Sequence, residues 1–174
     1  MLQSPATSDV YLRQHLLRHW GNLKTKNEKP GFITKFFDKP YEKKSILELV
    51  KAPVDAISGV SESDAQDLKK AFGIETVEDL VTNKYIKLAQ AITSFAASSG
   101  TILDKEYLPE EFKKLAEQPV SAISGVSKGD AALLKRAFGI DTIKDLAENK
   151  YVGIAQATVT LATLVQFLSS TGVI

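Results

Sequence analysis

Two histidines have the side chains and the spacing that could hold a metal ion. His15 and His19 lie four residues apart, so on a helix they share one face, and this spacing can chelate a metal. The 174-residue sequence contains no cysteine and offers no third ligand beside them. We therefore interpret both histidines as partly exposed residues, and we predict no metal site and no cofactor.

The sequence contains no recognisable catalytic motif. There is no nucleophile elbow, no phosphate-binding glycine loop followed by Lys-Ser/Thr, and no dinucleotide fingerprint. Acidic residues follow Ser or Thr at a distance of three, as Asp64 follows Ser61, which is the spacing of a helix-capping box. Because capping explains these carboxylates, we predict that the protein is not an enzyme.

One block of sequence occurs twice, 66 residues apart. Residues 56–74 read AISGVSESDAQDLKKAFGI, and residues 122–140 read AISGVSKGDAALLKRAFGI. When residues 53–92 are aligned with residues 119–158, 25 of the 40 positions are identical. This degree of self-similarity indicates an internal duplication.

The repeated block predicts a tight turn between two helices. A glycine at this point accepts a positive φ without steric cost, and the serine two residues later caps the next helix. Apolar residues at spacings of three and four then form one helical face, which a second glycine ends. The predicted turn residues are Gly59, Ser61, Gly125 and Ser127.

Each copy is predicted to contain four helices, so the fold class is all-α. Helices are expected to begin near residues 45, 61, 76 and 83 in the first copy and near residues 110, 127, 142 and 149 in the second. Another amphipathic helix is expected over residues 9–23. The end of the last helix, TVTLATLVQFL, is apolar on nearly all sides, so we expect it to be buried against copy one, a second protomer or another protein.

These residues resemble the helix-hairpin-helix family in its tandem, SAM-like form, which is also seen in the C-terminal domain of the bacterial RNA polymerase α subunit. The resemblance rests on ISGVS at residues 57–61, on FGIETVEDL at residues 72–80, and on their second copies. It implies two repeated helix-hairpin-helix four-helix units. Modules of this family serve both nucleic acids and proteins, so the resemblance leaves both functions open.

The resemblance also implies where a phosphate would bind. In family members that bind nucleic acid, a hairpin with two glycines brings its amides close to a phosphate. The second glycine is replaced here by Ser61 and Ser127, and copy one places Glu62 at the mouth of the helix. Copy two is more favourable, and its candidate phosphate-binding residues are Lys128, Gly129, Lys135 and Arg136. The alternative is that both hairpins are plain structural turns.

Residues 21–45 form a basic connector that is rich in aromatic residues, and we expect an extended arm. Three interpretations are open: a strap over the protein's own repeats, an arm that docks a partner, and a platform on which single-stranded nucleic acid stacks. The candidate docking residues are Phe32, Phe36, Phe37, Tyr41, Lys35 and Lys39.

The charge distribution separates the chain into four segments. The net charge is only +1, yet residues 1–45 carry nine Lys/Arg against four Asp/Glu. The first repeat, residues 46–98, and the acidic linker, residues 99–111, are each at −3, and residues 112–174 are at +2. The composition is that of a soluble globular protein, with no signal peptide and no unbroken apolar run of about 18 residues. We therefore expect a cytoplasmic protein without a membrane partner.

Two functions remain. The first is a non-enzymatic interaction or scaffold protein, a small subunit of a larger assembly, with a protein partner or a homo-oligomer as its binding mode. The alternative is a sequence-nonspecific nucleic-acid-binding protein that uses the hairpin of repeat two and the basic arm. The near-neutral net charge favours the first.

Overall fold

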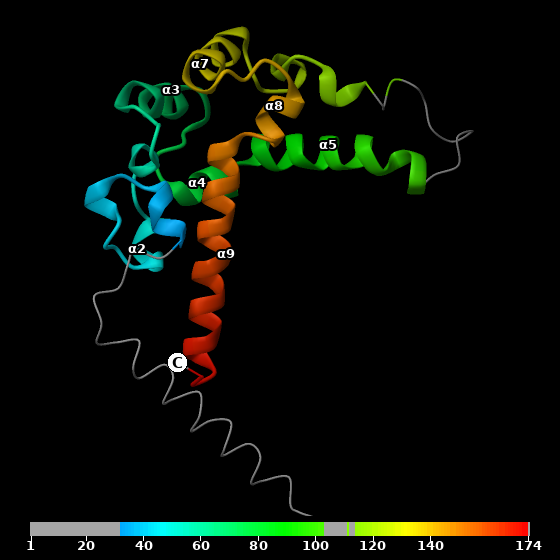
Figure 1. Ribbon diagram of the computed structural model, residues 1–174. Coiled ribbons are helices and arrows are strands. Elements are labelled where there is room, and N and C mark those ends of the chain that lie inside the picture. The colour runs from blue at the N-terminus through cyan, green and yellow to red at the C-terminus, as the bar shows by residue number, and fades with distance from the viewer. Residues whose placement is uncertain (1–31, 103–110, 112–113, 174) are drawn as a thin grey trace, which may run out of the picture. The chain divides into compact units, whose positions relative to one another are not determined.

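The computed structural model describes residues 32–102, 111 and 114–173 (Figure 1). The first half contains α2 (Ile46–Val50), α3 (Glu62–Phe72), α4 (Val77–Thr82) and α5 (Lys84–Ile102), and the second half contains α7 (Lys128–Phe138), α8 (Ile143–Ala147) and α9 (Lys150–Ser170). Short 3-10 helices precede or connect them: η2 (Phe32–Phe36), η3 (Lys39–Tyr41), η4 (Val54–Ala56), η6 (Leu115–Glu117) and η7 (Val120–Ala122). Within these ranges there are isolated bridges but no strand, which confirms the predicted all-α class.

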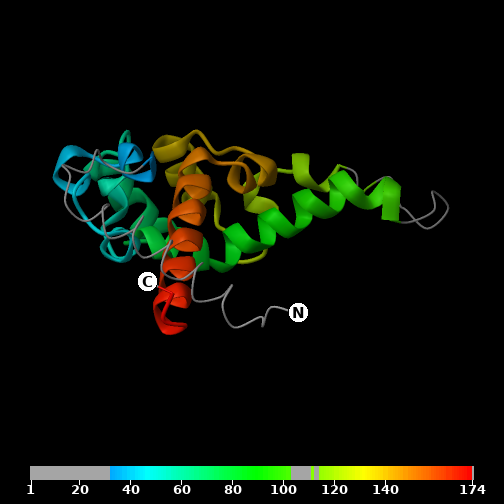
Figure 2. The ribbon, with the colours of Figure 1, turned by 60° about the horizontal axis from the view of Figure 1, so that its bottom comes forward.

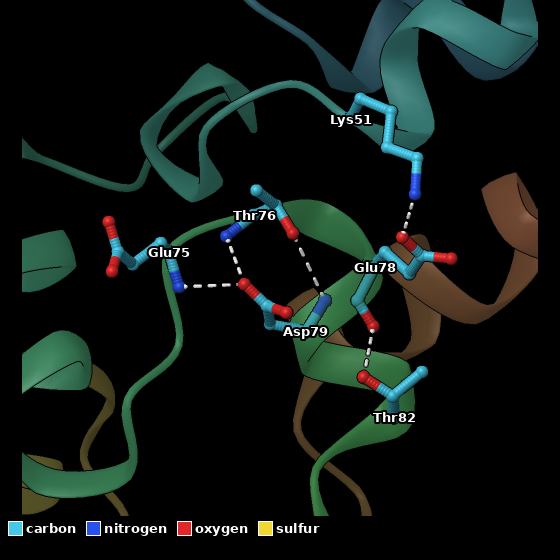
Figure 3. A network of polar contacts seen from close by, with 6 residues as sticks. All are labelled: Lys51, Glu75, Thr76, Glu78, Asp79 and Thr82. Carbon is cyan, nitrogen blue, oxygen red and sulfur yellow. Dashed lines mark hydrogen bonds and ion pairs between the residues drawn. The ribbon is translucent and has the colours of Figure 1, made fainter.

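Helix starts are fixed by local capping boxes. At the start of α4, the side chain of Thr76 accepts a hydrogen bond from the amide of Asp79, and the Asp79 carboxylate accepts from the amides of Thr76 and Glu75 (Figure 3). Lys51, at the end of α2, pairs with Glu78 on the neighbouring turn. The same reciprocal arrangement begins α2, α3, α7 and α8. Each box satisfies amides that have no partner inside the helix.

The last helix of each half packs on the other half. α5 lies against α8 and η6 of the second half, while α9 lies against α2 and α4 of the first half. Figure 1 shows α9 passing beside α2 and α4, and α5 passing beside α8. The two central helices, α3 and α7, also pack directly on one another. The core is therefore shared between the halves, because each half supplies a helix that covers the other.

Two equivalent glutamines meet where α5 and α9 approach each other. Gln90 and Gln156 are 66 residues apart, and Gln156 Nε2 donates a hydrogen bond of 3.0 Å to Gln90 Oε1. Gln90 Nε2 also donates to the carbonyl of Ala147 at 3.5 Å. Equivalent residues touch each other only near the axis that relates the two copies. The halves are therefore arranged about an approximate twofold axis, and Figure 2 shows α5 and α9 diverging from their meeting point.

The described part of the predicted arm is not extended. Residues 32–41 form two 3-10 turns, and Phe37 is only 1% exposed. Phe37 also pairs in an isolated bridge with Ile57. Burial of this side chain requires the backbone to turn back onto the first half, which an extended arm would not do. The predicted helix over residues 9–23, including His15 and His19, lies outside the described residues.

The helices expected to begin near residues 110 and 149 compare differently with the structure. In the second half, where a helix was expected over residues 110–118, the described residues 114–118 form only the short η6, which ends before Pro119. The last helix begins at Asn149, as expected, since this side chain accepts from the amide of Tyr151. Within this chain its distal part is only partly buried: Ala162 is 5% exposed, whereas Leu161, Leu164 and Phe167 are 41%, 51% and 61% exposed. Burial of these side chains against a second protomer or another protein stays a prediction.

Candidate functional site

The two glycine turns are held by tyrosines from the opposite halves. Gly59 has a φ of 92° and Gly125 a φ of 91°, a conformation that side-chain-bearing residues rarely adopt. Tyr151 Oη donates a 2.7 Å hydrogen bond to the carbonyl of Gly59, and Tyr85 Oη donates a 3.1 Å hydrogen bond to the carbonyl of Gly125. A Cβ on Gly59 would lie 3.1 Å from the tyrosine oxygen, and one on Gly125 only 2.8 Å. The turns therefore form contacts between the halves.

Each tyrosine ring is itself enclosed by neighbours from its own half. Tyr85 stacks on Phe72 with ring centroids 4.7 Å apart, and the ammonium of Lys84 lies 4.8 Å from the Tyr85 centroid. Phe138, Tyr151 and Lys150 repeat this arrangement at 4.5 Å and 4.7 Å. Aromatic stacking and the cation over the ring both hold the hydroxyl in place. A lysine thus lies near each turn and comes from the opposite copy.

The backbone amides beyond each turn are already occupied. The amide of Ser61 donates to Asp64 Oδ2 at 3.0 Å, and the amide of Ser127 donates to Asp130 Oδ2 at 2.9 Å. The amide of Val60 donates to the carbonyl of Ile57 at 3.0 Å. A phosphate at either hairpin would have to displace a carboxylate and would meet its negative charge. This geometry is that of a structural turn.

Most of the cations named for phosphate binding have acidic partners within the chain. Lys135 Nζ lies 2.8 Å from Asp141 Oδ1, and Arg136 pairs with Asp67. Gly129 occupies an ordinary position in the first turn of α7. Lys128 is exposed and has no ion pair among the described residues. Of the four candidates, Lys128 therefore brings the only cation that is not already neutralised nearby.

The Asp67–Arg136 pair joins α3 to α7. Arg136 Nε donates to Asp67 Oδ2 at 2.6 Å and Arg136 Nη2 to Asp67 Oδ1 at 2.5 Å, so the contact is bidentate. These hydrogen bonds lower the pKa of Asp67 and raise the pKa of Arg136. The residues at the equivalent positions are Leu133 and Lys70, which cannot form such a pair. The ion pair therefore occurs on one side of the approximate axis only.

The aromatic residues named for partner docking are divided between core and surface. Phe37 belongs to the core, so it is not available for docking a partner. Tyr41 packs on the core as a half-buried residue, and Phe36 is 37% exposed. Backbone hydrogen bonds from Ser58 to the Phe36 carbonyl and from Asp38 to the Ala56 carbonyl, both 2.9 Å, fasten this segment to the first turn. Phe32 begins η2, and Lys35 and Lys39 are exposed. Over residues 36–41 the segment is a strap.

The distal end of α9 presents several large apolar side chains to solvent. Leu161, Leu164 and Phe167 are 41%, 51% and 61% exposed, and Leu168 is partly exposed beside them. We call these four residues the distal apolar stripe. From Tyr151 to the end of the chain the sequence has no charged residue. The stripe is therefore an apolar surface with no charge within its own helix.

Polar side chains around the stripe bond to the helix that carries them. Thr163 Oγ1 donates to the carbonyl of Val159 at 2.9 Å, and Ser170 Oγ donates to the carbonyl of Phe167 at 2.8 Å. Thr171 Oγ1 donates to the same Phe167 carbonyl at 3.1 Å. These three hydroxyl donors keep their partners when the surface is covered, so their desolvation costs little.

One helical stretch in the described part of the chain, Ile143–Ser170, would be long and apolar enough to cross a membrane if length and composition alone decided. Its mean hydropathy is 1.5, and 22% of its most apolar window is buried inside the fold. Several residues of α9 face the shared core, including Val152 and Ala155 at 1% and 0% exposure. The proximal half of α9 is thus a core helix.

The contacts between the halves were not foreseen from the sequence. Tyr85, Tyr151, Gln90 and Gln156 were not among the predicted site residues, although Lys-Tyr and Ala-Gln-Ala are identical in the two copies. Identity at a polar position of a repeat is a signal that it contacts something specific. The Asp67–Arg136 pair has no such signal, because it breaks the repeat.

No metal centre emerges from the parts of the chain that the structure describes, since no three His, Asp or Glu side chains there could hold an ion together. Comparisons with protein-family models, with curated proteins and with solved structures found no match.

Proposed function

We propose that this chain is a non-enzymatic interaction protein, a small subunit or scaffold of a larger assembly, whose partner is a protein. The observation that carries this proposal is the distal apolar stripe. Three large side chains lie 41–61% exposed on a helix end without charge. Large contiguous apolar surface exposed to water is unfavourable and usually marks an interaction site.

We also propose that the chain is a tandem member of the helix-hairpin-helix family. In each half, a glycine with φ near 90° is followed two residues later by a capping serine and an 11-residue helix. Both of these helices end at a glycine with a φ of 67°. The repeated sequence and the repeated local geometry support this assignment, and cytoplasmic residence remains our prediction.

The polar surfaces support protein binding better than phosphate binding. At the hairpins, the serine amides are bonded to Asp64 and Asp130, and Tyr151 and Tyr85 cover the glycines. The amides are therefore occupied within each half, and the glycine carbonyls are used to join the two halves. The apolar end of α9 is left open to a partner.

The experiment that tests the proposal is a mass measurement of native complexes, before and after nuclease treatment. We expect a complex heavier than one chain that survives nuclease. Leu164→Lys should dissociate it, because a cation in the stripe cannot be desolvated cheaply. Gln166→Lys is the matched control, since it adds the same charge on the same turn about 200° around the helix. A complex that is lost only on nuclease treatment would refute the proposal.

Nucleic-acid binding is the second candidate, and one observation favours it. Lys128 is exposed and pairs with no acid within the described residues, and Lys84 lies close to the same turn through its contact with Tyr85. If these cations bind phosphates, affinity falls linearly with salt on a log–log scale. Lys128→Glu should then weaken binding at about 50 mM salt, while Lys69→Glu, in the first copy, should not. Absence of binding at that salt would exclude this candidate.

A further inference from the structure

We propose that the distal apolar stripe is covered by a second copy of this chain, so that two α9 helices pair about a twofold axis. This inference rests on the proposed function, and it names the partner of the surface described there. It concerns Leu161, Leu164, Phe167 and Leu168, the first three of which are 41%, 51% and 61% exposed.

Charge complementarity favours a second copy. An unrelated soluble partner is usually selected by opposite charges at the rim of the interface. The part of α9 beyond Lys150 offers no charge for such matching. Two copies of this uncharged segment meet without like-charge repulsion in either relative direction. The surface therefore complements itself.

The spacing of the stripe fits a pair of helices. Leu161, Leu164 and Leu168 are separated by three and four residues, which is the spacing of an apolar seam between two helices. A twofold axis near Leu164 would place this residue beside its own equivalent in the other copy. Such an interface is isologous and closes after two chains, so it gives a dimer rather than a filament.

A lipid surface fits the same helix less well. The segment Leu161–Ser170 rises only about 15 Å, half of the roughly 30 Å hydrocarbon thickness of a bilayer. Helices that lie in a membrane surface usually carry Lys or Arg on their polar face and Trp, Phe or Leu on the other. The distal end of α9 has Leu and Phe but no Lys or Arg, and its polar positions are Thr, Ser and Gln.

The size of the stripe predicts a weak dimer. At these exposures, the four side chains of each copy give a two-copy seam of roughly 700 Å², which is below the roughly 1,200 Å² of standard specific interfaces and in the range of weak, transient ones. We therefore expect association at micromolar concentrations and a monomer at high dilution.

Sedimentation equilibrium of the full purified chain, from about 1 to about 500 µM, tests this inference across the expected range. The mass should rise from one chain to two. Leu164→Glu should keep the chain monomeric and raise the dissociation constant at least tenfold. Gln166→Glu, which adds the same charge on the opposite side of α9, should leave the constant within twofold. A wild-type chain that stays monomeric throughout overturns the inference, as does a dimer that Leu164→Glu leaves unchanged.

Cysteine crosslinking gives an independent readout, because the chain has no cysteine of its own. Leu164→Cys should form a disulfide between two copies under mild oxidation, and Gln166→Cys should not. Equal crosslinking of both variants overturns the inference. If Leu164→Cys remains monomeric and its thiol resists a soluble maleimide, another part of the same chain covers the stripe, and the inference is again wrong.

Two further outcomes separate this inference from the proposed function. If the pure chain is monomeric and binds a different protein through Leu164, the inference that a second copy covers the stripe is wrong, but the proposed function stands. Flotation of the chain with neutral phosphatidylcholine vesicles, abolished by Leu164→Glu, overturns both. If the chain forms no complex with any protein and does not bind lipid, the proposed function itself is refuted.

Discussion

At the scale of single residues, the contact between a tyrosine hydroxyl and a glycine carbonyl has the clearest consequences. Tyr85 reaches Gly125, and Tyr151 reaches Gly59, so each turn depends on a residue of the other copy. The absence of a Cβ serves two purposes at these glycines. It permits the positive φ, and it leaves space for the tyrosine oxygen.

Gly125→Ala tests both purposes together. Its Cβ would lie 2.8 Å from Tyr85 Oη in a backbone conformation unfavourable to alanine, so we expect a loss of about 2–3 kcal/mol in the free energy of unfolding. Gly139→Ala is the matched control. It has a φ of 67° and open space around it, so only about 1 kcal/mol should be lost. Urea unfolding measures both.

A double substitution separates the clash from the backbone strain. Tyr85→Phe removes the oxygen that the new Cβ would meet, so Gly125→Ala should be less harmful in that background than alone. If the two losses simply add, the tyrosine oxygen is not the reason for glycine at this position.

Acid sensitivity follows from the capping carboxylates. Hydrogen bonds from the backbone and side chain of Ser45, at the start of α2, lower the pKa of Glu48 from 4.5 to about 2. The folded-state pKa is below the ordinary value, so the stabilisation is complete above pH 4.5 and is lost as the pH falls toward 2. Hydrogen bonds lower the pKa of Asp67 and Asp145 in the same direction.

We therefore predict that the urea midpoint is constant near neutral pH and falls below about pH 4.5. Glu48→Gln keeps the capping geometry but cannot titrate, so its midpoint should fall less steeply over the same interval. A midpoint that falls in parallel for Glu48→Gln and the wild type would show that this carboxylate does not contribute.

At the scale of elements, the exchange of terminal helices decides what each half needs for stability. α9 belongs to the second copy by sequence, yet it covers α2 and α4 of the first. α5 covers α8 and η6 of the second copy in the same way. Because α2 and α4 are only five and six residues long, they cannot bury their apolar faces without this cover.

A larger side chain on the buried face of an exchanged helix should therefore destabilise the opposite half. Ala155→Leu, at a position that is 0% exposed on α9, should destabilise the chain by about 1–3 kcal/mol and accelerate amide exchange in α2 and α4. Ala89→Leu, its equivalent on α5, should accelerate exchange in α8 and η6 instead. Ala157→Leu, on the exposed side of α9, should change neither. Faster exchange in the same half as the substitution would contradict the exchange of helices.

At the scale of the whole molecule, the shared core predicts cooperative folding. The two halves meet through α3 with α7, through both exchanged helices, through both tyrosine contacts and through the Asp67–Arg136 pair. A small half without these contacts buries too little apolar surface to be stable alone.

We predict that residues 32–102 and residues 103–174, produced separately, do not fold as monomers. Each should show little cooperative helix melting by circular dichroism, and mixing them should restore helix content and a single transition. A folded monomer of either half, with a cooperative melt, would mean that its own terminal helix can replace the exchanged one.

The sequence by itself determined the local features of this protein. The turn glycines, the Ser and Thr caps with their acids three residues on, and the positions of the main helices were all predicted, because each depends on backbone geometry and on neighbours within a few residues. The duplication was equally visible, since it is a property of the sequence. The all-α class followed from these features.

Only the tertiary structure decided which helix covers which half. Both exchanged and unexchanged arrangements bury the same apolar faces of α5 and α9, so periodicity cannot distinguish them. Phe37 is a second case, because a phenylalanine fits either a docking arm or a core. The Asp67–Arg136 pair is a third, because it forms only when the fold brings α3 and α7 together. The tertiary structure likewise decided that one side of α9 is buried as far as Ala162 while Leu161, Leu164 and Phe167 stay exposed, because the sequence does not show where neighbouring elements lie along a helix.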